Sequence, residues 1–261
     1  MSLAHTLIYH DVVAPERADE SGFLGADAAH YKLSPSAFDD HLRAIRDAGV
    51  RPLSDLAEVG SSRSALLTFD DGGGSALSEI APKLEAQGLR GVFLITTDRI
   101  GTPSFVTAED LRELARRGHI LGTHSASHPD RFSFLTPSAM EKEWRSSMRV
   151  LEEILGTPTK IASVPGGYYS RVVGESAAAV GLEVLFNSEP TSRWTRVGAT
   201  WIAGRYSVTR KTSPSGAAAL ARGGLRATLK QRATWETKKV VKAAFGTVWL
   251  EARRRIFRAM Q

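Results

Sequence analysis

The chain has 261 residues, enough for one large α/β domain, and 42% of them are hydrophobic, which is enough for a sizeable core. It has no cysteine, which excludes disulfides and thiolate metal sites, so any metal must be bound by His, Asp or Glu. No segment reaches the ~18 apolar residues of a membrane span, and residues 1–13 lack the pattern of a secretory leader. We therefore expect a cytoplasmic protein.

Short strand-like runs alternate with helix-like segments along the first 210 residues. Strands are predicted at residues 5–10, 65–69, 91–96, 119–123, 160–164, 182–187 and 205–208. Helices are predicted near 36–48, 76–87, 107–117, 137–155 and 170–180, where apolar residues recur at three- and four-residue spacing. This alternation of strands and helices indicates a mainly parallel sheet covered by helices, either a barrel or an open sheet. The polar residues 11–33 show no periodicity and are expected to form a long loop over one end of the sheet.

The positive charge is concentrated in the last part of the chain. Residues 205–261 contain 14 Lys and Arg against two Glu, a formal charge of +12, and the preceding residues carry −6. From residue 216 onward a basic helix is expected, with its apolar positions at Val241, Phe245, Val248 or Trp249, Ala252 and Ile256. Such a helix fits packing against the rest of the protein, binding to an acidic polymer or in the groove of a partner, or peripheral contact with an anionic membrane. Because the tail lacks interleaved exposed aromatic residues and a recognisable reading motif, nucleic-acid binding is not expected.

Functional side chains in βα architectures gather where the parallel strands end. The polar residues that follow the predicted strands are His10 and Asp11, Asp70 and Asp71, His124 and His128, 165–168, 187–189 and Arg205. Each of them is therefore a candidate for one shared site.

The segment "GTHSASHPD" places His124 and His128 four residues apart with small residues between them. Two neutral imidazoles and the Asp71 carboxylate can bind one divalent ion and leave positions open for water and substrate. The neighbouring Asp70 would then be free for proton transfer. The simpler interpretation is that these are loop histidines and that the aspartate pair caps the helix near 76–87.

Two sequence motifs resemble those of a known enzyme family. "TFDDG" at 68–72, followed about fifty residues later by "THSASHP", is similar to the first and second motifs of the polysaccharide deacetylases, carbohydrate esterase family 4 with the NodB-homology domain. "IYHDV" near the N-terminus and "VPGGYYSR" after a predicted strand also look like family features. The resemblance spans roughly residues 5–210.

The resemblance implies a distorted (β/α) barrel with about seven parallel strands that removes N-acetyl groups from a polysaccharide or saccharide precursor. It further implies a divalent metal, usually Zn²⁺ with Co²⁺, Ni²⁺ or Mn²⁺ as alternatives, bound by Asp71, His124 and His128. Asp70 is implied as the general base. The oxyanion and substrate-binding segment is implied at Gly166, Gly167 and Tyr168. Residues 1–215 would form the barrel, and residues 216–261 the basic helical extension.

The later family motifs are altered in this chain. The arginine that begins the third motif is replaced by Ser163, and Asn187 and Glu189 are only approximate counterparts of the fourth. The fifth motif lacks its histidine, the general acid, since the last strand reads "GRYSVTR". His10 is the best candidate for the missing acid, and Arg205 for the group that orients Asp70. Their simpler interpretations are a hydrogen-bonded strand-end histidine and a surface ion pair.

Three other functions remain open from the sequence. The first is a catalytically weakened homologue that binds metal and sugar, and the second is a metal-dependent amidohydrolase acting on a small non-glycan amide. The third is an Fe(II) oxygenase, because two His and one carboxylate can also hold that ion. An oxygenase mechanism would give Asp70 no catalytic role.

Overall fold

The computed structural model describes residues 5–52 and 64–237. One curled sheet runs through them in the order β10-β1-β3-β4-β5-β6-β7-β9-β8, with β2 also paired to β3. All neighbouring strands are parallel except β8 and β9. The strands are β1 (His5–Tyr9), β2 (Arg51–Pro52), β3 (Ser64–Phe69), β4 (Val92–Ile95), β5 (Ile120–Thr123), β6 (Ile161–Ser163), β7 (Val184–Phe186), β8 (Thr195–Val197), β9 (Thr200–Ala203) and β10 (Tyr206–Ser207).

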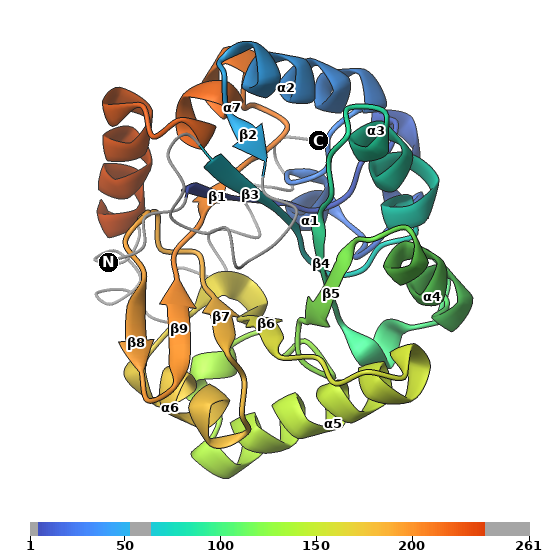
Figure 1. Cartoon of the computed structure of the whole chain (residues 1–261), viewed down its shortest axis with the longest axis vertical. Coiled ribbons are helices and arrows are strands. Elements are labelled where there is room, and N and C mark those ends of the chain that lie inside the picture. The colour runs from blue at the N-terminus through green and yellow to red at the C-terminus, as the bar shows by residue number, and fades with distance from the viewer. Residues whose placement is uncertain (1–4, 53–63, 238–261) are drawn as a thin grey trace.

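Helices surround the outer face of the curled sheet (Figure 1). The longer ones begin at capping residues that the sequence displays: Ser34 before α2, Thr107 with Asp110 before α4, and Thr136 before α5. The α-helices are α1 (Ala26–Ala29), α2 (Pro35–Asp47), α3 (Ala81–Glu85), α4 (Ala108–Arg116), α5 (Pro137–Leu155), α6 (Arg171–Ala179) and α7 (Pro214–Ala221). Short 3₁₀ or π segments are η1 (Pro15–Glu20), η3 (Ala76–Ile80), η4 (Thr97–Arg99), η5 (Phe132–Phe134) and η6 (Pro165–Gly167).

The predicted distorted barrel is confirmed in the form of an open, curled sheet whose strand path ends at β10 and β8. The seven expected strands correspond to β1, β3 to β7 and β10, and β9 is an additional parallel strand. The hairpin of β8 and β9 was missed because its two short runs, separated by the turn at Gly198, are too brief to show a clear period.

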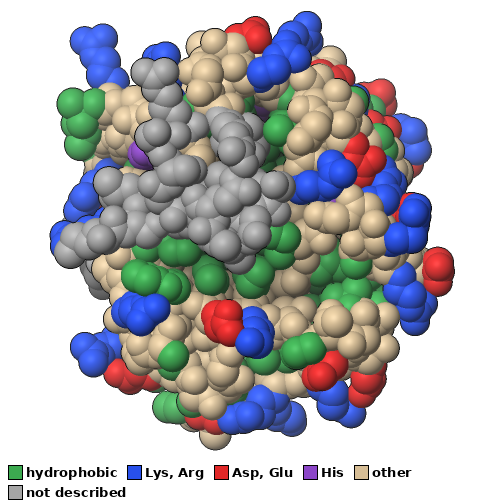
Figure 2. Space-filling view, in the orientation of Figure 1, with side chains coloured by type: hydrophobic (Ala, Val, Ile, Leu, Met, Phe, Trp, Pro, Cys, Tyr) green, Lys and Arg blue, Asp and Glu red, His purple; other side chains and the backbone are tan. Residues whose placement is uncertain are grey.

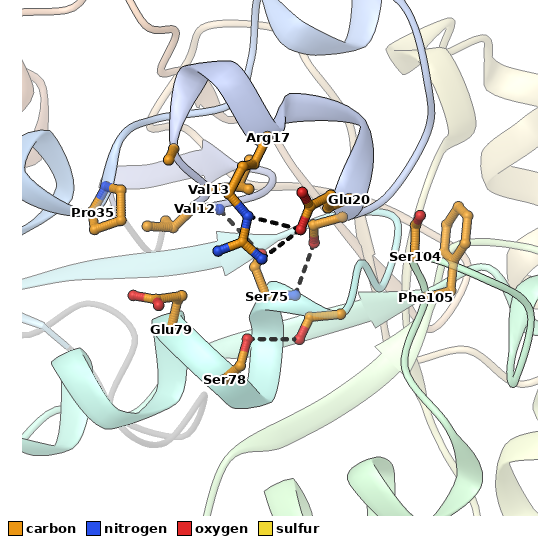
Figure 3. A pocket seen from close by; sticks show the side chains of 13 residues that line it. Val12, Val13, Arg17, Glu20, Pro35, Ser75, Ser78, Glu79, Ser104 and Phe105 are labelled. Carbon is orange, nitrogen blue, oxygen red and sulfur yellow. Dashed lines mark hydrogen bonds and ion pairs between the residues drawn. The ribbon is translucent and has the colours of Figure 1, made fainter.

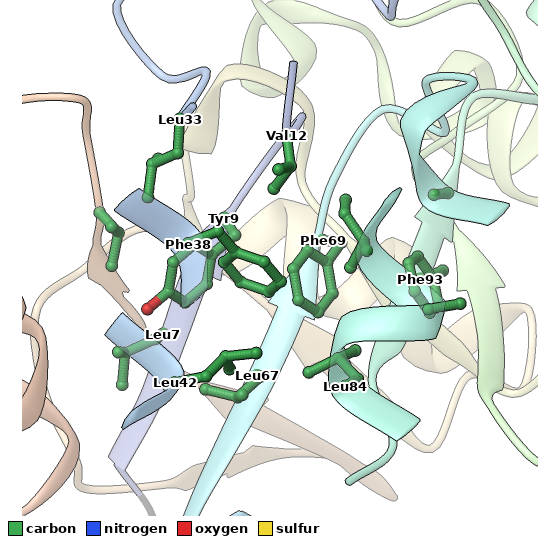
Figure 4. Packing of buried hydrophobic residues seen from close by; sticks show 14 of the residues in the cluster. Leu7, Tyr9, Val12, Leu33, Phe38, Leu42, Leu67, Phe69, Leu84 and Phe93 are labelled. Carbon is green, nitrogen blue, oxygen red and sulfur yellow. The ribbon is translucent and has the colours of Figure 1, made fainter. Parts of the chain in front are cut away.

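The main core packs side chains of β1, β3 and β4 against side chains of the surrounding helices, including α2 and α3 (Figure 4). Tyr9 stacks on Phe69 and Phe69 on Phe93, with ring centroids 5.6 and 5.0 Å apart. Gly91 allows this packing, because a Cβ there would lie 2.9 Å from the Phe69 ring. Since Tyr9 directly precedes His10 and Phe69 directly precedes Asp70, this aromatic row fixes where both polar side chains begin.

The surface mixes both signs of charge around the outline of the molecule (Figure 2). Many of these charges form exposed pairs between residues of the same helix, such as Arg116 with Glu113 in α4 and Arg171 with Glu175 in α6. Pairs of this kind contribute little to stability in water, typically ~0 to 1 kcal/mol. Stability therefore rests on the core and on the buried charges of the site.

The chain after β10 first packs back onto the sheet. Helix α7 contacts α2 and β1, and residue 216, where the barrel was expected to give way to the extension, lies within α7. Residues 225–237 are helical, and Gln231 binds the backbone of Ser207 through both its oxygen and its nitrogen. The apolar positions 241–256, on which the expected membrane contact rests, lie outside the described residues. Within the described ranges, no helix combines the length and apolarity that crossing a bilayer requires.

Candidate metal centre

The register of the parallel sheet brings the polar residues of distant segments to one edge. Tyr9 pairs with Phe69, Ile95 with Thr123 and Phe186 with Ala203, so that the residues after them meet at the same level. The backbone N–H of Asp70 donates to the Tyr9 carbonyl, and that of His124 donates to the Ile95 carbonyl. The strand ends therefore form one site, as expected for a parallel βα sheet.

Asp71, His124 and His128 each offer one ligand atom, and these three atoms lie within 4.8 Å of one another. Oδ1 of Asp71 is 3.4 Å from Nε2 of His124 and 3.7 Å from Nε2 of His128. The side chain of His124 is buried, whereas those of Asp71 and His128 remain 12% and 21% exposed. Two imidazoles and a carboxylate converging from one side fit a divalent cation with positions left open for other ligands.

The protonation states of the two histidines and the pKa of Asp71 are also compatible with binding of a cation. Burial lowers the pKa of His124 to about 3 and also lowers that of His128, so both rings are neutral near pH 7 and keep a lone pair for a metal. Burial raises the pKa of Asp71 to about 7. Its carboxylate therefore gains from a positive partner at this place.

The backbone bends sharply at two of the three candidate ligands. Asp71 has φ 78° and His128 has φ 57°, the left-handed region that residues other than glycine seldom adopt. Ser125, between the two histidines, has φ 65°. Strain of this kind is maintained only where the surrounding structure imposes it, and it clusters at functional sites.

Glu143 of α5 holds the histidine loop in place. Its carboxylate accepts hydrogen bonds from the backbone N–H groups of Ala126 and Ser127, at 3.0 and 2.9 Å, and from the Ser127 hydroxyl at 2.8 Å. Sequence reasoning missed Glu143, because a glutamate on a charged helix has the same pattern as a solvated one. Its contacts form only when α5 packs beside β5.

Asp70 lies beside the candidate ligands but has a different partner. The guanidinium of Arg205 binds both its carboxylate oxygens, with Nη1–Oδ1 at 2.7 Å and Nη2–Oδ2 at 2.8 Å. Arg205 is fully buried and is fixed by the Thr68 hydroxyl and the carbonyl of Asn187. Burial opposes ionisation of Asp70, but the Arg205 charge outweighs it and holds the pKa of this carboxyl well below its ordinary value.

His10 lies at the end of β1, next to both aspartates. Its charge acts to lower the pKa of Asp70 and of Asp71, and its ring contacts Tyr31 at a centroid distance of 4.9 Å. Nδ1 of His10 is buried without a hydrogen-bond partner. The ring therefore has a nitrogen that no other described protein group engages.

The predicted oxyanion segment forms the tight turn η6 after β6. Gly166 and Gly167 both have positive φ, 62° and 69°, and the Gly167 N–H donates to the Val164 carbonyl. A Cβ on Gly167 would lie 2.2 Å from the Ser188 hydroxyl, so the turn packs against the loop after β7. A Cβ on Gly166 would be 3.3 Å from the ring of Tyr168.

Asp11, a candidate for the shared site, instead belongs to a buried hydrogen-bond network that supports the loop after Asp71. Asp11 is buried and accepts hydrogen bonds from the Ser21 and Ser75 hydroxyls. The ammonium of Lys32 donates to three carbonyls of residues 18–23 and pins the predicted loop 11–33. A Cβ on Gly73 would lie 1.9 Å from Oδ1 of Asp11, which explains one of the three glycines after Asp71.

A cavity of about 400 Å³ opens on the other side of this network (Figure 3). It is lined by Val12, Ser75 and Glu79 among others, and by the ion-paired side chains of Arg17 and Glu20. None of the predicted site residues lines this cavity. The candidate metal centre is thus separate from it.

Sequence comparison finds similarity to the polysaccharide deacetylases. The family model "Polysaccharide deacetylase" matches residues 57–185. Among curated proteins of Bacillus subtilis (strain 168), "Putative polysaccharide deacetylase YxkH" is 23% identical over 167 residues, 61% of this chain and 60% of that protein. "Putative polysaccharide deacetylase YheN" is 27% identical over 134 residues, 51% of this chain and 42% of that protein. The matches thus cover less than two thirds of either relative.

Solved structures agree with this result. The polysaccharide deacetylase BC0361 from Bacillus cereus superposes with a TM-score of 0.71 at 17% identity, over 84% of this chain and 69% of that one. IcaB from Ammonifex degensii gives a TM-score of 0.68 at 22% identity, over 85% and 98% of the two chains. At these identities the likeness shows the fold. Taken with the sequence matches, it confirms the resemblance to the polysaccharide deacetylase family that the motifs indicated.

The crowding at Gly73 leads to a first prediction. Gly73→Ala should destabilise the protein by about 1–3 kcal/mol, because the new methyl group must displace the hydrogen-bonded Asp11 carboxylate. Gly74→Ala is the matched control: its Cβ meets only ordinary contacts, the nearest at 3.6 Å, so a change within about 0.5 kcal/mol is expected. Urea unfolding of both variants measures the difference. Equal stability of the two would contradict the packing described here.

The buried ion pair leads to a second prediction. Arg205→Met should cost about 3–5 kcal/mol at pH 7, because Asp70 is left buried without its partner. Adding Asp70→Asn should recover part of this loss, and Arg171→Met, which removes an exposed arginine, should stay within about 0.5 kcal/mol.

Acid titration adds a further check on the pair. Since the pKa of Asp70 is depressed in the folded protein, its stabilisation is present above the unfolded-state pKa of ~3.9 and lost as pH falls through the folded value. Wild-type stability should therefore fall more steeply in acid than that of the double variant. Parallel curves, or a double variant less stable than Arg205→Met, would count against the pair.

Proposed function

We propose that the chain hydrolyses the N-acetyl group of a saccharide with the help of a divalent cation held by Asp71, His124 and His128. The observation that supports this most is the different environment of two adjacent carboxylates. Asp71 points to two neutral imidazoles, whereas Asp70 is ion-paired with Arg205. Asp71 is thereby suited to bind a cation and Asp70 to accept a proton, and metal-assisted deacetylation needs both roles.

The proposed reaction breaks the C–N bond of the acetamide and forms a C–O bond to water, giving acetate and an amine. When bound, a cation such as Zn²⁺ supplies Lewis acidity that lowers the pKa of water and stabilises negative charge on oxygen. Asp70 takes the proton of the attacking water. Arg205 keeps Asp70 ionised and fixes the direction of its oxygens, which is the task of a positioning residue.

The leaving amine needs a proton, and His10 is the proposed donor. Its unpartnered Nδ1, at the same edge as both aspartates, supports this role. The Gly166 N–H is proposed to donate to the acetyl oxygen as negative charge develops there. The Gly167 N–H is already committed to the Val164 carbonyl.

Acetate release from N-acetylglucosamine oligomers by the Zn²⁺-loaded protein tests this proposal. Asp70→Asn and His10→Ala should each lower kcat by about 10²- to 10⁴-fold, the usual contribution of a general base or acid, with zinc content unchanged. Asp98→Asn, which alters an exposed aspartate of the neighbouring η4 segment, is the matched control and should retain the wild-type rate.

The outcomes discriminate between the proposed function and two of the functions left open by the sequence. Zinc binding with acetate release from small amides alone would replace the saccharide by a non-glycan substrate. Zinc binding without release from any amide would contradict an enzyme and favour a weakened sugar-binding homologue. An unchanged rate in His10→Ala would remove this residue from the mechanism.

A further inference from the structure

A serine occupies the place where the third family motif has an arginine, and its contacts join two parts of the site. Ser163 is the last residue of β6 and is fully buried. Its Oγ lies 2.5 Å from Nδ1 of His124 and 3.3 Å from Oδ1 of Asp70. Its backbone carbonyl is also close to His124, 3.1 Å from Nδ1. One residue thus touches a candidate metal ligand and the proposed base.

The direction of these hydrogen bonds follows from the number of protons available. Asp70, ion-paired with Arg205, is a carboxylate and can only accept, so the single hydroxyl proton of Ser163 goes to Oδ1. The Ser163 oxygen must then accept from His124, which requires the proton of the imidazole to be on Nδ1. The Ser163 carbonyl, which can only accept, requires the same tautomer.

We propose that Ser163 is a positioning residue that orients the base Asp70 and holds His124 in the Nδ1–H tautomer, leaving Nε2 as the metal-binding nitrogen. Nε2 is the atom that faces Asp71, at 3.4 Å. The inference rests on the proposed function for the role of Asp70 as base. The part concerning His124 stands on the geometry alone.

Arg205 explains why a serine can replace the arginine. Both oxygens of Asp70 are already bound by the Arg205 guanidinium, which comes from the segment between β9 and β10 and is completely buried. A second guanidinium from β6 would have to be buried against the first. The small hydroxyl of Ser163 instead adds a weaker donor to Asp70 and gains a contact with His124. The two tasks of charge compensation and ligand orientation are thus divided between two residues.

Zinc affinity, measured by competition with a chelator, tests the role of Ser163 without reference to activity. Ser163→Ala should weaken zinc binding by about tenfold or more, because groups that orient a ligand typically contribute 10- to 100-fold. Ser163→Thr keeps the hydroxyl and should restore most of the affinity. Ser176→Ala removes another buried serine hydroxyl, which accepts from Trp144 Nε1 and donates to the Val173 carbonyl within α6, and should leave zinc affinity unchanged.

A spectroscopic readout separates positioning from general destabilisation. Two-bond ¹H–¹⁵N correlation spectra of the zinc-free protein should show His124 protonated at Nδ1. Protonation at Nε2 would overturn the proposal, as would a Ser163→Ala variant with wild-type zinc affinity and kcat. If Ser163→Ala does not fold, the wild-type spectrum and Ser163→Thr still decide the question.

The outcomes also distinguish this inference from the proposed function. Loss of zinc affinity in Ser163→Ala together with Nδ1 protonation, in a protein that releases no acetate, would refute the deacetylase and retain the role toward His124. Acetate release that is unaffected by Ser163→Ala, with zinc affinity also unaffected, would retain the deacetylase and refute the role of Ser163.

Discussion

The buried ion pair between Arg205 and Asp70 is the interaction on which the candidate site depends. It ties the end of β3 to the segment between β9 and β10, 135 residues away in sequence, and allows a carboxylate to remain charged inside the protein. The adjacent Asp71 has no such partner among the described residues, and burial raises its pKa. The two adjacent carboxylates can coexist at the strand end because Asp70 is paired with Arg205 and Asp71 is placed where it can bind a cation.

Two further charged side chains in or beside the surrounding loops also have specific hydrogen-bond partners. The ammonium of the buried Lys32 donates to three carbonyls, and the carboxylate of the partly buried Glu143 accepts from two backbone N–H groups. These hydrogen bonds give both residues a structural role, because they engage the charged groups with the backbone. Glu143 holds the loop that presents His128 in a left-handed conformation, whereas Lys32 holds the segment of Ser21, whose hydroxyl accepts from the Ser75 N–H in the loop after Asp71.

The strand ends could be predicted because a parallel sheet places the residues after its apolar runs at one level. That reasoning identified Asp70, His124 and Arg205 as neighbours, and the Arg205 contact follows from the same register. The supporting groups could not be found in this way. Lys32 lies in an aperiodic polar loop, and lysine is seldom buried without partners, so only tertiary contacts reveal it. The β8–β9 hairpin escaped because short runs carry little periodicity.

The location of a bound ion tests the central claim most directly. Anomalous diffraction at the zinc absorption edge, on crystals of the Zn²⁺-loaded protein, should show one ion bound by Asp71, His124 and His128. Asp70 should remain paired with Arg205 and lie outside the ligand set. An ion coordinated by Asp70, or no ion at this place under saturating zinc, would contradict the assignment of one aspartate to the metal and the other to proton transfer.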